Sequence, residues 1–114
     1  MSEIEGIARF KIHPGKLEDF KRLSAECMES VRTKDSGTLQ YDLFFNEDQT
    51  ECIVHERYRN SEALLEHFQN LDKTMDAILA TGSVSGEILG TPSPELRKAL
   101  EGSGVRIFTP YQSL

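Results

Sequence analysis

The sequence predicts one α+β domain over residues 1–114, in which two helices cover one face of an antiparallel sheet. Three observations support this prediction. Apolar and polar residues alternate in several short segments, which is the period of a strand with one buried face. In two longer segments apolar residues recur at steps of three and four, which is the period of an amphipathic helix. A length of 114 residues is also typical of one domain.

The first half of the chain predicts a strand, a helix and a hairpin. Alternation over residues 4–12 predicts the first strand. Residues 16–33 carry one apolar stripe, and cations near the end of this stretch favour the negative end of a helix dipole. Alternation resumes over residues 38–45 and 51–58, on either side of a polar turn at 46–49, so these two segments are expected to form a hairpin.

The hairpin register follows from the position of its turn. A turn centred on residues 47–48 sets Leu43 opposite Cys52. It sets Tyr41 opposite Val54 in the same way. The apolar faces of the two strands then coincide, as they must when one face of the sheet is buried.

The second half of the chain begins with a helix, for which Ser61 is the expected N-cap. Further along, Ser93 followed by Pro94 predicts the start of a short helix, because Ser caps well and Pro suits the first helical position. The elements expected after the hairpin are, in order, a helix over 62–71, a helical continuation over 73–80, a strand over 84–89, a helix over 94–100 and a strand over 105–109.

The predicted order is β-α-β-β-α-β, which is that of a ferredoxin-like sheet, followed by a short helix and an extra strand. Both long helices cover one face of this sheet, but the other face also carries apolar side chains. An apolar second face needs a cover, so the sequence predicts a homodimer packed sheet against sheet. The last strand can then reach across to the partner. The apolar residues of the second face are Ile7, Phe44, Ile53, Leu89 and Phe108.

Composition and charge exclude several classes of partner. Thirteen Lys and Arg oppose nineteen Asp and Glu, so the formal net charge is −6. A surface for nucleic acid or for an anionic membrane needs clustered cations, so neither partner is expected. The first residues lack the basic and apolar regions of a secretory signal, and the two cysteines, Cys27 and Cys52, form no Cys-x-x-Cys motif. The sequence therefore predicts a reduced, cytoplasmic protein.

Two polar side chains interrupt otherwise apolar faces. Glu56 lies on the inward face of its strand, and His67 lies on the apolar stripe of the second long helix. Periodicity therefore places a carboxylate and an imidazole between sheet and helices, where apolar surroundings shift pKa values and favour proton transfer. The same positions also fit structural roles, with His67 at the helix edge and Glu56 paired to a nearby arginine. The aromatic residues expected beside them are Tyr41, Tyr58 and Phe68.

The sequence predicts neither a metal site nor a bound cofactor. His55 and Glu56 project to opposite faces of one strand, so they cannot hold one ion together with His67. The chain has no glycine-rich phosphate loop or dinucleotide motif. It also lacks the Gly-x-Ser-x-Gly elbow of a serine nucleophile, and both Cys27 and Cys52 lie on apolar faces that are typical of core positions.

Three short motifs follow one another along two strands and a helix. They are Gly37-Thr38-Leu39-Gln40-Tyr41, Glu56-Arg57-Tyr58 and Ala63-Leu64-Leu65-Glu66-His67. In order and spacing they resemble the antibiotic biosynthesis monooxygenase family, and the resemblance covers residues 4–109. It implies a dimeric α+β barrel. The chain differs from haem-degrading members, because it has no Trp and because Ala8 stands where those members carry Asn.

The resemblance implies a small cofactor-independent monooxygenase that oxidises an aromatic or quinol-like small molecule with O₂. An electron-rich substrate anion then reacts with O₂ itself, and the protein supplies a dry pocket and a proton acceptor. His67 is expected as the acid–base or orienting group, and Glu56 as the group that orients His67 or takes the proton. The residues expected to bind substrate are Tyr41, Tyr58 and Phe68. Two alternatives stay open: a non-catalytic dimeric module that binds or senses a small molecule, and an isomerase that moves protons without O₂.

Overall fold

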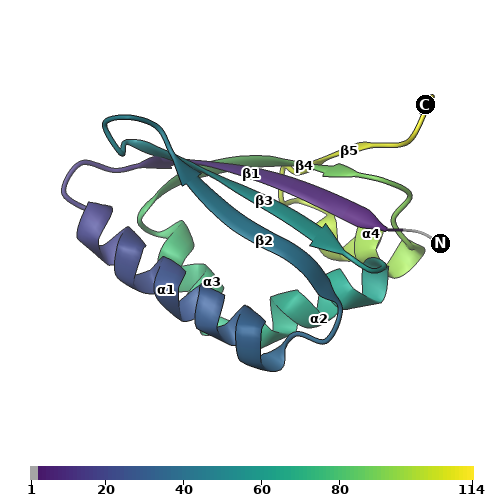
Figure 1. Ribbon diagram of the computed structural model, residues 1–114, viewed down its shortest axis with the longest axis horizontal. Helices are drawn as coiled ribbons and strands as arrows, with labels where there is room; N and C mark the ends of the chain where they lie inside the picture. The colour runs from purple at the N-terminus through teal and green to yellow at the C-terminus, as the bar shows by residue number, and fades with distance from the viewer. Residues whose placement is uncertain (1–2) are drawn as a thin grey trace.

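A computed structural model describes residues 3–114 and places a five-stranded sheet over a layer of helices (Figure 1). Residues 1 and 2 of the predicted domain lie outside the described residues. The strands are β1 (Ile4–Ile12), β2 (Thr38–Phe45), β3 (Glu51–Tyr58), β4 (Gly82–Leu89) and β5 (Arg106–Phe108). The helices are α1 (Leu17–Lys34), α2 (Ser61–Leu71), α3 (Lys73–Leu79) and α4 (Pro94–Leu100). None of the helices in residues 3–114 is long and apolar enough to cross a membrane.

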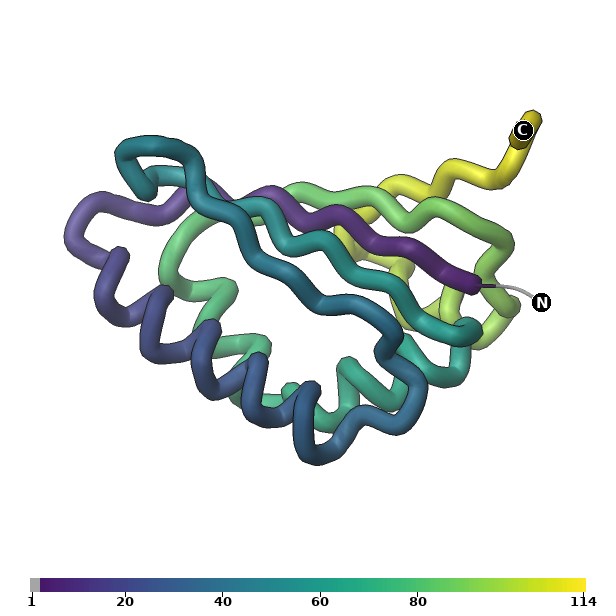
Figure 2. The backbone as a smooth tube through the Cα atoms, viewed as in Figure 1, coloured from purple at the N-terminus to yellow at the C-terminus, as the bar shows by residue number. Residues whose placement is uncertain are grey.

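The strands lie in the order β2-β3-β1-β4-β5. Neighbouring strands among β1 to β4 pair antiparallel, whereas β5 pairs parallel to β4. The helices lie on one side of the sheet, with α1 and α3 side by side (Figures 1 and 2). The predicted α+β class is therefore confirmed, with its β-α-β-β-α-β order and its C-terminal helix and strand.

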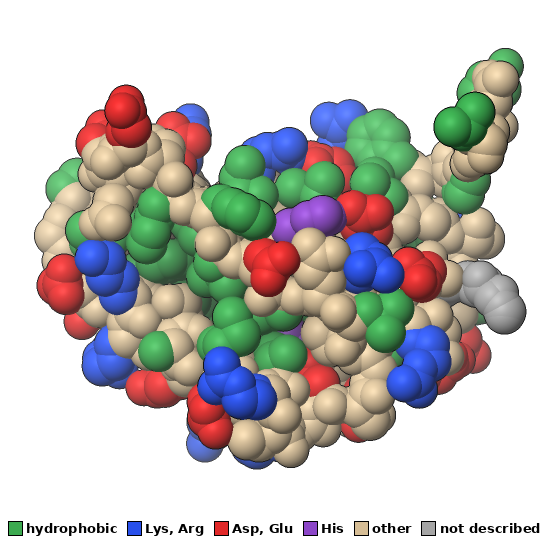
Figure 3. Space-filling model, in the orientation of Figure 1, with side chains coloured by type: hydrophobic (Ala, Val, Ile, Leu, Met, Phe, Trp, Pro, Cys, Tyr) green, Lys and Arg blue, Asp and Glu red, His purple; other side chains and the backbone are tan. Residues whose placement is uncertain are grey.

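The face of the sheet that points away from the helices carries exposed apolar side chains. Phe44, Ile53 and Phe108 are 56%, 40% and 43% exposed. Figure 3 shows hydrophobic side chains among charged ones on the sheet side of the molecule. A second copy packed against this face stays a prediction. The last strand, β5, pairs with β4 of its own chain, and its reach toward a partner stays a prediction as well.

The β2–β3 hairpin has the predicted faces but a different register. Leu43 lies opposite Val54 rather than Cys52. Tyr41 likewise lies opposite Glu56. The predicted pairing is therefore wrong by two positions along the partner strand. A shift of two keeps every side chain on its predicted face, so the inward and outward assignments hold.

The chemistry of the turn explains this register. The Asn46 side chain accepts a hydrogen bond from the backbone N–H of Glu51 at 2.9 Å, and Asp48 accepts one from the N–H of Thr50 at 3.2 Å. Gln49 adopts a φ of +57°, a left-handed conformation that closes the turn. These bonds centre the turn one residue later than its polar composition indicates, because side chain–backbone bonds rather than composition fix a turn.

The two helix caps tie α2 to α4. Asn60, rather than the predicted Ser61, caps α2 by accepting a hydrogen bond from the N–H of Ala63 at 2.9 Å. Ser61 is buried instead, and its Oγ accepts from the N–H of Ser93 at 2.9 Å. Ser93 caps α4, as predicted, by accepting from the N–H of Leu96 at 3.1 Å. The start of α4 is therefore bonded to the first turn of α2.

The helical stretch after α2 is a separate helix, because Asp72 interrupts it with a φ of +44°. The following strand begins at Gly82, two residues before its predicted start at Val84. A Cβ atom at Gly82 would lie 2.2 Å from the backbone oxygen of Lys11 on β1. Only glycine therefore lets β4 approach β1 at this point.

Replacing Asn60 by alanine is expected to lower the free energy of unfolding by about 1 kcal/mol, because an N–H in the first turn of α2 loses its acceptor. Urea unfolding followed by far-UV circular dichroism measures this change. Gln69→Ala on the exposed side of α2 is the control, and it should stay within about 0.5 kcal/mol of the wild type. Equal stability of the Asn60→Ala variant and the wild type would remove Asn60 as the cap.

The buried core is divided into two clusters. One packs the inner sheet face against α1 and α3, and the other packs it against α2 and α4. Between them β1 carries Gly6 and Ala8, whose small size leaves space above the helices. The first cluster is Phe10, Phe20, Leu23, Cys27, Cys52, Val54, Leu71 and Ile78, and the second is Ile4, Tyr58, Ala63, Leu64, Ile88, Leu96 and Leu100.

Candidate functional site

A cavity of about 570 Å³ lies between the sheet and the helices, with members of both core clusters in its walls. This volume suits a small organic molecule. Gly6 and Ala8 form part of its wall on the sheet side. Leu100 of α4 and Val105, just before β5, also line it, so the C-terminal part of the chain contributes to the same cavity.

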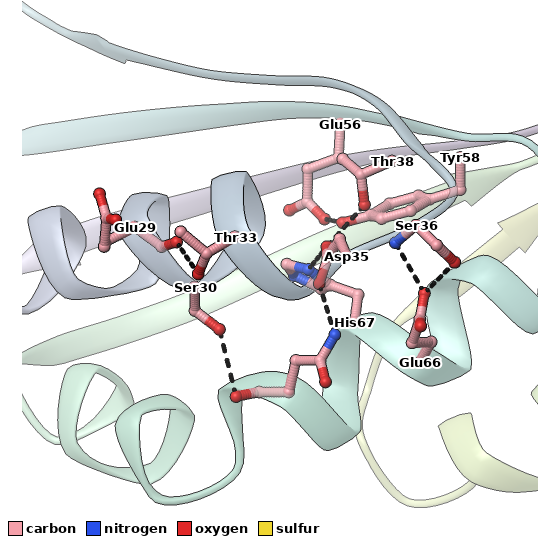
Figure 4. Close-up of polar contacts among 11 residues, drawn as sticks. Glu29, Ser30, Thr33, Asp35, Ser36, Thr38, Glu56, Tyr58, Glu66 and His67 are labelled. Atoms are coloured by element: carbon pink, nitrogen blue, oxygen red, sulfur yellow. Dashed lines mark hydrogen bonds and ion pairs between the residues drawn. The ribbon is translucent and has the colours of Figure 1, made fainter.

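His67 reaches this cavity from α2 with its ring held in place (Figure 4). Its side chain is 3% exposed, and its Nδ1 lies 2.8 Å from Oδ2 of Asp35, whose side chain is 1% exposed. Nδ1–H donates to the carboxylate, which leaves Nε2 for a ligand. Within residues 3–114 every buried side-chain nitrogen and oxygen has a hydrogen-bond partner. Nε2 has no hydrogen-bond partner in those residues, so it is not one of the fully buried nitrogens, and it is accessible from the cavity that His67 lines.

Asp35 accepts hydrogen bonds from two further side chains. Thr38 Oγ1 donates to its Oδ2 at 2.6 Å, and Asn70 Nδ2 donates to its Oδ1 at 2.8 Å. The arrangement forms because Asp35 directly follows α1, while His67 and Asn70 stand three residues apart on one side of α2. Burial by itself raises the pKa of Asp35, but the hydrogen bonds from Thr38, Asn70 and His67 outweigh it and lower the pKa below its ordinary value.

Glu56 reaches the same cavity from β3. Tyr58 lies on the same face of the strand and donates its hydroxyl to Oε1 of Glu56 at 2.5 Å (Figure 4). Burial raises the pKa of Glu56, and the opposing effects of Tyr58 and His67 are smaller. The site therefore favours the protonated carboxyl group. Burial also raises the pKa of both Tyr41 and Tyr58, which keeps the two phenols neutral.

Three aromatic rings surround the imidazole of His67. The ring centroids of Tyr41 and Tyr58 each lie 5.3 Å from its centroid, and that of Phe68 lies 6.2 Å away. These rings limit the access of water to the imidazole on the sides that they cover. His67 is therefore held by a carboxylate on one side and by aromatic surfaces around it, and it is free toward the cavity.

The structure brings the predicted site residues together. Tyr41, Glu56, His67 and Phe68 all line the cavity. Tyr58 is fully buried and contacts the site through its bond to Glu56. The sequence also allowed a position for His67 at the exposed edge of the helix, but the structure buries its side chain. It also allowed an arginine partner for Glu56, but the carboxyl group bonds to Tyr58 instead.

Sequence reasoning missed Asp35. It lies in a connection without periodicity, directly after Lys34, where a polar residue is normally solvated. The one available signal is electrostatic: a carboxylate beside the negative end of a helix dipole is unfavourable unless other donors hold it. In the structure the carboxylate bonded to the imidazole of His67 is that of Asp35, and not that of Glu56.

Cys27 and Cys52 are buried free thiols, which agrees with their assignment to the core. Burial, with a smaller contribution from the charge of Glu26, raises the pKa of Cys27 to about 11. A thiol with that pKa is a poor nucleophile at neutral pH. Within residues 3–114 no group of three or more His, Cys, Asp or Glu side chains is placed to hold a metal ion.

Replacing Glu56 by glutamine is expected to stabilise the fold at pH 7–8. The raised pKa of Glu56 means that the wild type loses stability as pH rises from the unfolded-state pKa, about 4.3, through the folded-state pKa. Glutamine is uncharged and keeps an acceptor for Tyr58, so the gain should shrink to nothing near pH 4. Urea unfolding of both proteins between pH 4 and 8 measures it. A gain that does not depend on pH would contradict the raised pKa of Glu56.

Comparison with solved structures finds several relatives of the same fold. MupZ from Pseudomonas fluorescens aligns with a TM-score of 0.87 and 25% identity, covering 100% of this chain and 94% of MupZ. Rv0793 from Mycobacterium tuberculosis aligns with a TM-score of 0.71 and 25% identity, covering 81% of this chain and 97% of Rv0793. SnoaB, a cofactor-independent oxygenase from Streptomyces nogalater, aligns with a TM-score of 0.70, 14% identity and coverage of 100% and 98%. At that identity SnoaB shows the fold alone.

Comparison with sequences identifies the family. No curated protein matches the chain. The sequence model of the antibiotic biosynthesis monooxygenase family matches residues 4–77, which are more than half of the chain. This match includes the strand and helix motifs that carry the resemblance, and it confirms that resemblance. The chain belongs to the antibiotic biosynthesis monooxygenase family.

Proposed function

We propose that the protein is a small cofactor-independent monooxygenase that oxidises an aromatic or quinol-like molecule with O₂. The observation that carries this proposal is the His67–Asp35 pair, which opens into a largely apolar cavity. A base in such a site can take the proton of a bound phenol, because the buried carboxylate stabilises the imidazolium that forms. Family membership supports the use of O₂, and SnoaB, of the same fold, is a cofactor-independent oxygenase.

The oxidation balances without an added reductant. The phenol loses its proton to Nε2 of His67, and the resulting electron-rich anion transfers electrons to O₂. For a substrate with a methylene between two conjugated rings, the sum is R₂CH₂ + O₂ → R₂C=O + H₂O. The substrate supplies all four electrons that O₂ accepts. One oxygen atom ends in the product carbonyl and the other in water.

Glu56 is proposed as the acid of this reaction. Burial raises its pKa and so favours the form that can donate a proton, in the same cavity as the proposed base. Tyr58 donates to Oε1, which leaves Oε2 to carry the proton. The anion and O₂ form a hydroperoxide, R₂CH–OOH, with the proton that His67 returns. When its O–O bond breaks, Oε2 gives a proton to the departing oxygen, which leaves as water, and His67 takes the remaining C–H proton and passes it back to Glu56. The roles of Tyr41 and Phe68 are to hold the aromatic substrate against the imidazole.

Oxygen uptake with anthrone and with 1,4-naphthohydroquinone tests the proposed reaction. With anthrone we expect uptake of one O₂ for each ketone formed, and one atom from labelled O₂ in the product. His13 is an exposed histidine in the turn after β1, so the His13→Ala variant is the control and should keep the wild-type rate. Uptake at the rate of buffer alone with both compounds would contradict an oxygenase of this substrate class.

A second candidate function is proton transfer without O₂. It is favoured by one specific observation, namely that Glu56, whose pKa is raised by burial, and the His67–Asp35 pair reach the same cavity. Under nitrogen in D₂O, an isomerase of this kind introduces deuterium into the compound whereas an oxygenase releases no oxidised product. Binding without either reaction, and unchanged by His67→Ala, would instead identify a binding or sensing module.

A further inference from the structure

We propose that the cavity selects uncharged ligands: it accepts a largely apolar neutral molecule and rejects the same molecule once it carries a sulfonate, carboxylate or phosphate. This selectivity rests on the proposed function, because it concerns the same cavity. It narrows the substrate class to compounds that enter as neutral molecules and ionise only when His67 takes their proton.

The charges in the cavity wall are the first support. The described lining residues include no Lys and no Arg. They do include Glu56 and, on the helix side, the exposed Asp72 and Asp76. A fourth acidic lining residue, Glu87, has its carboxylate bonded to Arg9 at 2.6 Å. With Glu56 favouring its neutral form and Glu87 paired to Arg9, an anion that enters meets the carboxylates of Asp72 and Asp76 and no Lys or Arg side chain of the described wall.

The hydroxyl groups of the wall are the second support, because most of them are already donating. Ser24 donates to the backbone oxygen of Lys21 at 3.0 Å, and Ser103 donates to that of Leu100 at 2.6 Å. The hydroxyl of Tyr58 behind the wall is taken by Glu56. Among the described lining residues only the hydroxyl of Tyr41 makes no such bond. A buried anion needs several donors to replace its water shell, and one hydroxyl does not supply them.

The His67–Asp35 pair is the third support. If His67 is protonated, its positive charge is balanced by the Asp35 carboxylate at 2.8 Å, so the pair adds no net positive charge to the cavity. A neutral ligand that gives its proton to His67 leaves the total charge of the site unchanged. A ligand that arrives as an anion adds an uncompensated negative charge to a poorly solvated site, which is strongly unfavourable.

Two fluorescent probes with the same ring system test this selectivity. N-phenyl-1-naphthylamine is neutral, and 8-anilino-1-naphthalenesulfonate is the same skeleton with one sulfonate. Fluorescence titration is expected to give at least about tenfold tighter binding of the neutral probe, since an unpaired buried charge is worth more than one decade of affinity. Equal or tighter binding of the sulfonate would overturn the proposal.

A charge reversal separates the effect of a charge in the cavity wall from the effect of the net charge of the protein. Asp76→Lys places a cation in the wall, and it should tighten sulfonate binding by about fivefold while it changes neutral-probe binding less than about twofold. Glu47→Lys is the matched control, because it makes the same charge change in the exposed hairpin turn outside the cavity wall. Equal effects of the two variants on the sulfonate would show that only the net charge of the protein matters, against the proposal.

Filling the cavity shows whether the probes bind there. Ala8→Leu adds side-chain volume to the wall and should weaken binding of the neutral probe about tenfold or more. Gly6→Ala is a milder second variant, because its added Cβ lies 3.6 Å from the nearest side-chain atom and fits without a clash. Unchanged binding in both variants would overturn the assignment to this cavity. Neither probe requires O₂, so a failure here is distinct from a failure of the oxygenase reaction.

Discussion

Replacing His67 by alanine is expected to lower the rate of product formation by about 10²–10⁴-fold, the usual contribution of one acid–base group. The reason is that Nε2 of His67, which opens into the cavity, is the proposed base. Initial rates of O₂ uptake with anthrone, at saturating and at low substrate, measure the loss. His67→Gln keeps a polar side chain of similar length but has no basic nitrogen, so it should lose nearly as much activity.

The matched control is the His13→Ala variant, which removes an exposed imidazole and should keep the wild-type rate. The predicted loss should fall on kcat more than on KM, because the aromatic surfaces that hold the substrate remain. Full activity of a folded His67→Ala variant would exclude His67 as the base. Activity lost through KM alone would make it a binding residue instead.

Replacing Asp35 by alanine is expected to destabilise the fold by about 3–5 kcal/mol, which is typical when one partner of a buried charged network is removed. The donors on Thr38, His67 and Asn70 then lose their common acceptor inside the protein. Urea unfolding at pH 7 measures the change. Glu47→Ala removes a carboxylate in the exposed hairpin turn and should stay within about 0.5 kcal/mol of the wild type.

The same substitution has a pH signature. The pKa of Asp35 is lowered in the folded state, so its ionised form contributes stability above the unfolded-state pKa of about 3.9. That contribution is lost as pH falls through the folded-state pKa. The difference between wild type and Asp35→Ala should therefore be constant near neutral pH and shrink below about pH 4. A difference that stays constant down to pH 2 would show that the contribution of Asp35 to stability does not depend on the charge of its carboxylate.

The elements of the fold are largely predictable because burial imposes a period on the sequence. The bounds of β1, β2 and β3 follow from alternation alone, since a half-buried strand permits apolar residues on one face only. The hairpin register does not follow in the same way. It depends on side chain–backbone bonds of Asn46 and Asp48, and composition does not show which of several polar residues will make them.

The candidate site is predictable where it lies on periodic elements. Glu56 and His67 stand out because each breaks an apolar face. Asp35 does not stand out, because a residue outside a helix or strand belongs to no apolar face that it could interrupt. Its position against His67 depends on where α1 ends relative to α2. The polar partner that fixes the imidazole therefore comes from tertiary structure, whereas the imidazole itself is visible in the sequence.

The cavity between the two core clusters gives room for a ligand but lowers the stability of the fold. Gly6 and Ala8 leave unfilled volume between two otherwise well-packed clusters, and unfilled volume in a protein interior weakens the fold. A larger apolar residue at Ala8 would add contacts to the first cluster, against which Ala8 packs, and occupy the space of a ligand. Selection of variants for thermal resistance alone should therefore enrich larger residues at this position and close the cavity. A stabilised form meant to keep its ligand must take its added stability from the outer sheet face or the helix caps instead.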